Sequence, residues 1–218
     1  GGALKWEQDF WINPESALEI ANKIKEIKDK WIELALVFGW WNIYRWSNLI
    51  ASWVNASDSH NMSMLSTVFN GLTIKNFLEK VWIKAVVMDP NGIKFVEAYN
   101  KDKAKEYIED GVVVICTWWT WNPYFTTDSG WVLRSLELDC NMMIKATKVD
   151  GIYDKDPVKH EDAQFFENIS YDEVISKNLK IMDQTAVVLA KESSQILKVV
   201  NMSKSWAILN AIEGEKEG

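Results

Sequence analysis

Short apolar runs alternate with helix-spaced apolar stripes along the chain, and this pattern predicts alternating strands and helices. Asn13 followed by Pro14 is typical of a helix start, because the Asn side chain can accept hydrogen bonds from free N–H groups and proline fits the first helical turn. Apolar residues continue this helix at helical spacing: Ile20, Ile24 and Ile27. The run IELALVF, residues 32–38, then predicts a strand that is buried on both faces.

The alternation continues to the end of the chain. It predicts further helices near residues 62–80, 101–110, 128–140 and 183–193, and strands at residues 84–88, 111–116, 141–147 and 196–202. The helix near 62–80 is expected to have one apolar face, formed by Leu65, Phe69 and Leu72. Ser170 and Glu173 form a capping box that begins one more helix. The order predicts an α/β fold, a three-layer α/β/α sandwich with a mostly parallel central sheet, whose ligands collect at the carboxyl ends of the strands.

Composition narrows the classes of function. The chain has 218 residues, a net charge of -7 and a pI near 5.0, which argues against nucleic acid as a partner. No apolar run reaches the roughly 20 residues of a membrane span, and two cysteines give no disulfide framework. We therefore expect a cytoplasmic protein with small-molecule ligands. Tryptophan is unusually frequent, with 13 residues against 10 glycines.

The segment NPYFTTD, residues 122–128, stands between a predicted strand and a predicted helix. It combines an amide, two aromatic rings, hydroxyls and a carboxylate. Thr127 and Asp128 could simply cap the helix. Alternatively, the free N–H groups of the helix and these side chains could hold a phosphorylated substrate, with Asp128 orienting a lysine or a magnesium ion.

A second motif, KATKVDGIYDKDP at residues 145–157, follows a later predicted strand. Together with NPYFTTD, YDEV and KIMDQTAVVLA, it resembles the uridylate kinase branch of the amino-acid kinase family over essentially the whole chain. The resemblance implies a single domain over residues 1–218, in which about 1–130 bind UMP and about 131–218 bind ATP. It also implies in-line transfer of the γ-phosphoryl group of ATP to UMP in pyrimidine nucleotide biosynthesis, with Mg²⁺ accompanying ATP.

The resemblance assigns site residues by position. The UMP site would contain Trp40, His60, Thr120, Trp121, Asn122, Pro123, Tyr124, Phe125, Thr126 and Thr127. The ATP site would contain Gly1, Trp41, Arg45, Thr147, Tyr153 and Asp156. Asp128 and Arg45 would be catalytic, and no protein metal site is expected. The family also implies a homohexamer with GTP as an effector.

The chain departs from the family pattern in three respects. The family has an acidic residue at the position of His60, which Asp58 could replace. The family begins with a strand that ends in Lys-x-Ser-Gly; Gly1 corresponds to about that glycine, and the strand and its lysine are missing from the sequence. The family also has glycine in two phosphate-contacting turns where this chain has tryptophan: Trp40, Trp41 and Trp46, then Trp118, Trp119 and Trp121.

The remaining tryptophans also fall where the family has, or accepts, glycine: Trp6, Trp11, Trp31, Trp53, Trp82, Trp131 and Trp206. A side chain forced into glycine-only backbone costs on the order of 1–3 kcal/mol. We therefore expect a kinase of impaired activity. The alternatives are a non-catalytic nucleotide-binding or storage protein on the same fold, and a surface on which tryptophans stack against single-stranded nucleic acid or sugar.

Overall fold

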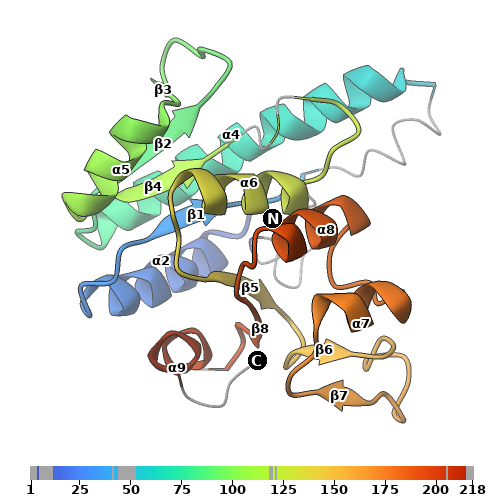
Figure 1. Ribbon diagram of the computed structural model, residues 1–218. Helices are drawn as coiled ribbons and strands as arrows, with labels where there is room; N and C mark the ends of the chain where they lie inside the picture. Colours follow the sequence, from blue (N-terminus) through green and yellow to red (C-terminus); the bar gives the residue numbers. More distant parts are fainter. Residues whose placement is uncertain are drawn as a thin grey trace. The chain divides into compact units, whose positions relative to one another are not determined.

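The computed structural model describes residues 4, 12–40, 42–43, 53–117, 120, 122–204 and 206–214. The chain divides into two units, Gly1–Arg134 (unit 1) and Ser135–Gly218 (unit 2). Each unit contains parallel strands with helices beside them, as Figure 1 shows. The α/β class predicted from the sequence is therefore confirmed.

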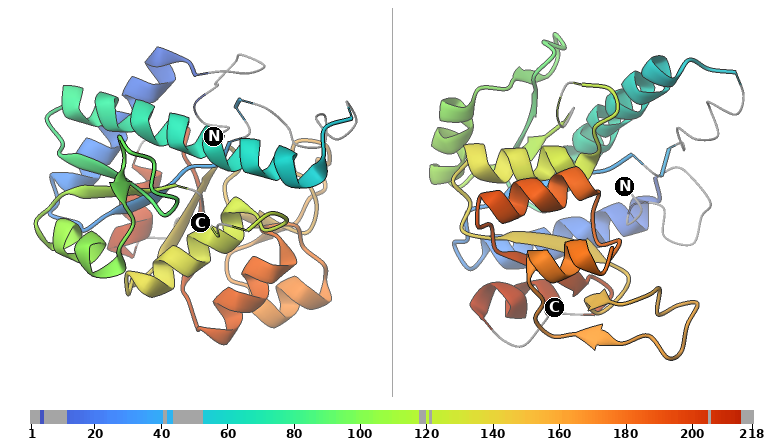
Figure 2. Two further views of the ribbon diagram at one scale, coloured as in Figure 1. Left: turned by 90° about the horizontal axis from the view of Figure 1, so that it is seen from above. Right: turned by 45° about the vertical axis from the view of Figure 1, so that its right-hand side comes forward.

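Unit 1 is built on a parallel four-stranded sheet. Its strands lie in the order β1 (Ala35–Val37), β4 (Val113–Cys116), β2 (Ala85–Asp89) and β3 (Glu97–Ala98). Helix α2 (Pro14–Lys28) packs against α4 (Ala56–Lys80), and α4 also contacts β2 and β4. Helix α5 (Lys101–Glu109) packs against β4 on the other side of the sheet from α4 (Figure 2). The unit ends in α6 (Thr127–Glu137), which continues three residues into unit 2.

Unit 2 has a parallel pair of strands, β5 (Met143–Thr147) and β8 (Leu197–Asn201). A short antiparallel pair, β6 (Ile152–Tyr153) with β7 (Phe165–Phe166), was not predicted from the sequence. The unit also contains three helices: α7 (Tyr171–Ser176), α8 (Gln184–Glu192) and α9 (Ala207–Glu213). Both bonds of the predicted capping box at Ser170 and Glu173 are present.

Helix starts follow the local signals in the sequence. The Asn13 side-chain oxygen accepts hydrogen bonds from the backbone N–H groups of Glu15 (2.8 Å) and Ser16 (3.0 Å), which confirms the predicted start of α2. Helix α4 begins six residues earlier than predicted, because Asn55 caps it through the N–H of Ser57. Apolar spacing did not predict this part of the helix, because the first turn of α4 is polar.

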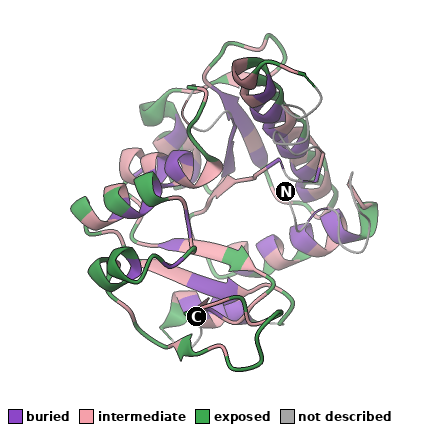
Figure 3. Ribbon diagram, turned by 90° about the vertical axis from the view of Figure 1, so that its right-hand side faces the viewer, coloured by how far each residue is buried: buried purple, intermediate pink, exposed green. Residues whose placement is uncertain are grey.

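The predicted apolar face of α4 is wrong. Leu65 and Phe69 are 55% and 45% exposed, whereas the face toward the sheet carries Met64, Val68, Ile74 and Leu78. Burial of one face of α4 and of strands β2 and β4 can be followed in Figure 3. Strand β1 was predicted to be buried on both faces, but its three residues are only half-buried. Helical spacing alone cannot distinguish two apolar stripes on one helix.

Four of the described tryptophans take the left-handed backbone conformation that favours glycine. Their φ angles are 60° at Trp31, 69° at Trp53, 66° at Trp82 and 72° at Trp206. Trp82 occupies the same capping position after α4 that Gly111 occupies after α5. The prediction that tryptophan stands at glycine-type backbone is confirmed at these four positions.

Candidate functional site

The first candidate site lies at the carboxyl edge of the unit 1 sheet. Val37 at the end of β1 and Met88 of β2 both pair with Cys116, the last residue of β4. Because the strands are parallel, the segments that follow β1, β2 and β4 leave the sheet at the same edge. The described residues of these segments, 38–40, 42–43, 90–96, 117, 120 and 122–126, therefore follow the strands at this one edge.

A buried amide pair holds the segment after β1. Asn42 Nδ2 donates to Asn70 Oδ1 (2.9 Å), and Asn70 Nδ2 donates to Asn42 Oδ1 (2.8 Å) and to the Gly39 carbonyl (2.7 Å). Neither side chain is exposed. This pair cannot be predicted from the sequence, because the two asparagines are 28 positions apart and only the packing of α4 brings them together.

A buried carboxyl group joins the ends of β2 and β4. The Thr117 hydroxyl donates to Asp89 Oδ2 (2.9 Å), and the Asn91 N–H donates to Asp89 Oδ1 (2.8 Å). Burial raises the pKa of the Asp89 carboxyl above its usual value, and the two hydrogen bonds oppose part of that rise. Asp89 was also absent from the sequence-predicted site, since a single Asp after a strand is a weak signal.

The segment NPYFTTD begins α6, as predicted, but the cap is Thr126. Its hydroxyl oxygen lies 3.2 Å from the N–H of Asp128 and 3.4 Å from that of Ser129. The predicted capping by the Thr127 hydroxyl is therefore wrong. The Thr127 hydroxyl is buried and has no hydrogen-bond partner within the described part of the chain. A buried, unpaired hydroxyl costs about 1–3 kcal/mol, so a ligand that bonded to it would recover that energy.

Other predicted UMP ligands lie nearby in unit 1. Asn122 Nδ2 donates to the Thr120 carbonyl (3.0 Å), so these two polar residues support each other. The Tyr124 ring lies 5.0 Å from the His60 ring of α4, at an interplanar angle of 49°. Pro123 is half-buried, and Phe125 is 41% exposed. The structure thus brings His60 to the NPYFTTD segment, although the two are 62 residues apart at their nearest.

Partial burial lowers the pKa of the His60 imidazole below its usual value. The neutral ring is therefore favoured at neutral pH. A neutral imidazole can still donate one hydrogen bond and accept another, whereas a carboxylate only accepts. His60 consequently differs in chemistry from the acidic residue that the family resemblance implies at this position.

Trp40 lies where the resemblance implies a phosphate-contacting glycine. Its side chain is only 5% exposed and packs against Met64 of α4. The indole is therefore part of a small buried cluster and does not stand in solvent. Four other predicted residues lie outside the described residues: Gly1, Trp41, Arg45 and Trp121.

The second candidate site lies at the carboxyl edge of the β5–β8 pair in unit 2. Thr147 ends β5, and its hydroxyl donates to the Val149 carbonyl (2.8 Å). The Tyr153 ring meets the Phe165 ring edge-on at 5.4 Å across the β6–β7 pair. Asp156 is exposed and accepts from the N–H of Val158 (3.0 Å), which shapes the following turn.

Asp150 joins the two strand ends of this second site. Its Oδ1 accepts from Asn201 Nδ2 (2.8 Å) and lies 2.9 Å from Lys204 Nζ. These hydrogen bonds lower the pKa of the Asp150 carboxyl, which therefore stays ionised. Asn201 and Lys204 were missed from the sequence, because only the parallel pairing of Thr147 with Asn201 brings them beside this loop.

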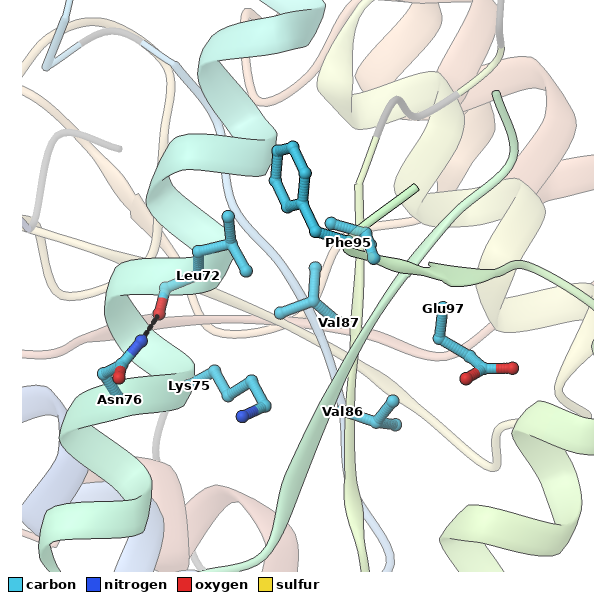
Figure 4. Close-up of a pocket in the computed structure, with 8 residues that line it drawn as sticks. Leu72, Lys75, Asn76, Val86, Val87, Phe95 and Glu97 are labelled. Atoms are coloured by element: carbon cyan, nitrogen blue, oxygen red, sulfur yellow. Dashed lines mark hydrogen bonds between the residues drawn. The ribbon is translucent and has the colours of Figure 1, made fainter. Parts of the chain in front are cut away.

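A separate pocket of about 240 Å³ lies between α4 and the β2–β3 region (Figure 4). Leu72, Val87 and Phe95 give it an apolar lining, with Lys75 and Glu97 at its edge. Its lining includes none of the residues predicted to bind UMP or ATP. Nucleotide binding is therefore predicted at the strand ends and not in this pocket.

Among the described residues, no three His, Cys, Asp or Glu side chains gather as a metal site would require. No described helix is both long enough and apolar enough to cross a bilayer.

A family model and the sequences of known proteins both place this chain in one family. The model of the amino acid kinase family matches residues 10–201. The chain is 40% identical to the uridylate kinase of Chromohalobacter salexigens, covering 100% of this chain and 87% of that protein. It is 38% identical to the uridylate kinase of Xanthomonas oryzae, of which it covers 91%.

Solved structures give the same result for the fold. The UMP kinase of Bacillus anthracis superimposes with a TM-score of 0.96 at 28% identity, covering 100% of this chain and 91% of that one. The UMP kinase of Ureaplasma parvum superimposes with a TM-score of 0.91 at 32% identity, covering 99% and 92%.

Proposed function

Because the chain belongs to the amino acid kinase family, we propose that it is a UMP kinase, which transfers the γ-phosphoryl group of ATP to UMP and forms UDP for pyrimidine nucleotide biosynthesis in the cytoplasm. The observation that carries the proposal is the full-length similarity to uridylate kinases, at 40% identity to that of Chromohalobacter salexigens. The arrangement of polar groups at the carboxyl edge of the unit 1 sheet supports it.

UMP binds at the start of α6 in this proposal. The free N–H groups of a helix N-terminus attract phosphate, and the unpaired Thr127 hydroxyl lies in the first turn of α6. Thr120, Asn122, Pro123, Phe125 and Thr126 form the surrounding segment, and Trp40 and Trp121 belong to the site by family position. The paired rings of His60 and Tyr124 offer a face and two polar edges to the nucleoside.

ATP binds through unit 2 in this proposal. Thr147 ends β5, and Tyr153 and Asp156 follow it, where an adenine and ribose pocket is expected at the strand ends. Gly1, Trp41 and Arg45 are assigned to ATP by family position. Arg45 would place its guanidinium on the transferring phosphoryl group, because its planar fork can bind two oxygens at once.

Magnesium enters with ATP. Mg²⁺ usually keeps several waters and is held by one or two carboxylates together with substrate phosphates. The half-buried Asp128 carboxylate in the first turn of α6 fits that need, and the described residues offer no larger acidic cluster. When bound, the ion would neutralise charge on the phosphates; the protein itself supplies positioning, since phosphoryl transfer requires no protein nucleophile.

An assay of UDP formation tests the proposal. The chain is incubated with ATP, UMP and Mg²⁺, with parallel samples that contain AMP or CMP, or an excess of chelator. We expect slow UDP formation that requires UMP and Mg²⁺. Protection against heating by ATP without any UDP formation would instead favour a non-catalytic nucleotide-binding or storage protein on the same fold.

Thr127→Val is expected to weaken UMP binding about tenfold, because it removes the hydroxyl that the phosphate would pair with and keeps the side-chain shape. Titration calorimetry with UMP measures this without relying on turnover. Thr73→Val on α4 is the matched control, since the Thr73 hydroxyl bonds only within its own helix in the described structure. Equal UMP affinity in both variants would remove Thr127 from the site.

A homohexamer is part of the proposal, with GTP as its effector. One exposed face of α4 carries Met62, Leu65 and Phe69, at spacings of three and then four residues. Met62, Leu65 and Phe69 are 49%, 55% and 45% exposed. This spacing is typical of a stripe that packs against another helix. A second copy of the chain is the proposed partner, because α4 of that copy would offer the same stripe.

Phe69→Glu is expected to lower the oligomeric mass in solution, because a charge in the centre of the apolar stripe is costly to bury. Light scattering after size-exclusion chromatography measures the mass. Val188→Glu on α8 is the control, since Val188 is 46% exposed and lies outside α4. If neither variant changes the mass, α4 is not the interface. GTP is tested by adding it to the UDP assay.

A further inference from the structure

One turn of α4 touches both segments that the proposed UMP site needs. Asn70 contacts the segment after β1, and Gly71 contacts the segment after β4. We propose that Asn70 and Gly71 form a positioning element, which sets the distance between these two segments and so shapes the phosphate site. The identity of the ligand, UMP, rests on the proposed function. The contacts of Asn70 and Gly71 rest on the geometry of the structure alone.

Both the nitrogen and the oxygen of the Asn70 side-chain amide form hydrogen bonds with the segment after β1. Its Nδ2 donates to Asn42 Oδ1 and to the Gly39 carbonyl, and its Oδ1 accepts from Asn42 Nδ2. In the described part of the same segment, the Ile43 N–H also donates to the Trp40 carbonyl (2.9 Å). Because the amide pair is fully buried, water cannot replace these bonds when they are broken.

Gly71 fixes the other segment by close approach. A β-carbon at Gly71 would lie 3.0 Å from the Thr117 methyl group and 3.3 Å from side chains of Ile115 and Val87. Glycine is therefore required if α4 is to lie this near to β4. Thr117 is held in turn by its hydrogen bond to Asp89, so it cannot move aside without breaking a buried contact.

The two contacts act on different segments from neighbouring residues of a rigid helix. Gly39, Asn42 and Thr117 are therefore placed relative to each other through α4, and not only through the sheet. A phosphate that bonds to both segments needs that spacing to be correct to a fraction of an ångström. Asn70 and Gly71 would thus act on the ligand through the segments that they hold.

Asn70→Ala and Asn42→Ala test the first contact from the helix side and from the loop side. Hydrogen exchange at residues 39–43 is expected to become about tenfold faster or more in both variants, because the loop loses its buried bonds. The UMP dissociation constant is expected to rise by about tenfold. Gly71→Ala should raise it as well, through displacement of Thr117.

Two variants of α4 are the controls. Asn76→Ala removes an amide that bonds only to Leu72 in the described structure, and it should leave both measurements unchanged. Ile74→Val trims a buried side chain and lowers stability without touching the amide pair, so UMP affinity should stay unchanged. A loss of affinity in Ile74→Val equal to that in Asn70→Ala would overturn the inference, since stability would then explain it.

The exchange measurement separates this inference from the proposed function. Unchanged exchange at residues 39–43 in folded Asn70→Ala and Asn42→Ala overturns the positioning element. Faster exchange in a chain that binds no UMP upholds the contacts and contradicts the UMP site. Faster exchange with weaker UMP binding supports both.

The backbone conformation of the tryptophans leads to a second inference, which does not depend on the first. Within the described residues, eight residues other than glycine have a positive φ angle, and four of them are tryptophan. Three of these four, Trp31, Trp53 and Trp82, are more than 90% exposed. Tryptophan normally buries most of its surface and is not a left-handed residue, so neither packing nor conformation explains its presence there.

We infer that glycine is the residue that the source organism inserts at the 13 tryptophan positions, through a codon that one genetic code reads as tryptophan and another as glycine. Mass spectrometry of the protein isolated from its own cells tests this. The intact mass should be lower by 13 times the difference between a tryptophan and a glycine residue, with almost no indole absorbance. A peptide from those cells that contains tryptophan at position 82 would overturn the inference.

Discussion

Replacing Trp40, Trp41, Trp46, Trp118, Trp119 and Trp121 by glycine is expected to raise the rate of UDP formation by about a hundredfold or more. By family position these residues belong to the turns that contact phosphate. There, bare backbone N–H groups can approach the phosphate oxygens, whereas an indole side chain excludes the ligand from that space. The rate is measured with saturating ATP, UMP and Mg²⁺.

The control for this change is a chain in which Trp31, Trp53 and Trp82 become glycine. These three side chains are almost fully exposed and belong to neither turn, so the rate per folded molecule should not change. Trp40 also contributes a buried contact with Met64, and thermal midpoints are therefore compared in parallel. A folded six-glycine chain that neither binds UMP nor forms UDP would contradict the kinase proposal.

Trp82→Gly is expected to stabilise the chain by about 1 kcal/mol, because the left-handed conformation is costly for any residue with a β-carbon. The side chain is 91% exposed, so its removal loses little burial. The capping bonds remain available: the N–H of residue 82 donates to the Glu79 carbonyl (3.1 Å), and the Ile83 N–H donates to the Leu78 carbonyl (2.9 Å). Thermal unfolding should show a rise of about 2–4 °C.

Gly111 provides the reverse experiment. Gly111 follows α5 and has a φ angle of 78°. Its N–H donates to the Ile108 carbonyl (2.9 Å), and the Val112 N–H donates to the Tyr107 carbonyl (2.8 Å), which is the same pair of bonds as at Trp82. Gly111→Trp should therefore lower stability by about the amount that Trp82→Gly gains. Trp131→Gly, inside α6, should lower stability by about 1 kcal/mol, because glycine is unfavourable within a helix. A stabilising effect of Gly111→Trp would refute the account of the capping position.

Local signals located most elements of the fold. Asn13 with Pro14 set the start of α2, the Ser170–Glu173 box set the start of α7, and apolar runs set β2, β4, β5 and β8 to within a few residues. These features act between neighbours in the chain, so they can be read without a tertiary structure. The two-residue strands β3, β6 and β7 were not found, because so few residues carry no periodic pattern.

The candidate site was only partly visible in the sequence. NPYFTTD stood out because many polar and aromatic groups occur within seven residues. Asn70, Asp89 and Asn201 did not stand out, since each is one polar residue within an ordinary helix or strand end. Their roles come from partners between 28 and 51 residues away: Asn42, Thr117 and Asp150.

By itself the sequence determined the α/β class, the helix caps at Asn13 and Ser170 and the family, because these depend on residue order, local hydrogen bonds and continuous motifs. It also indicated glycine-type backbone at the tryptophans. Only the tertiary structure decided which stripe of α4 is buried, which threonine caps α6, and which distant amides close the loop after β1. Those outcomes depend on how one element packs against another, and burial makes a polar partner necessary only once that packing exists.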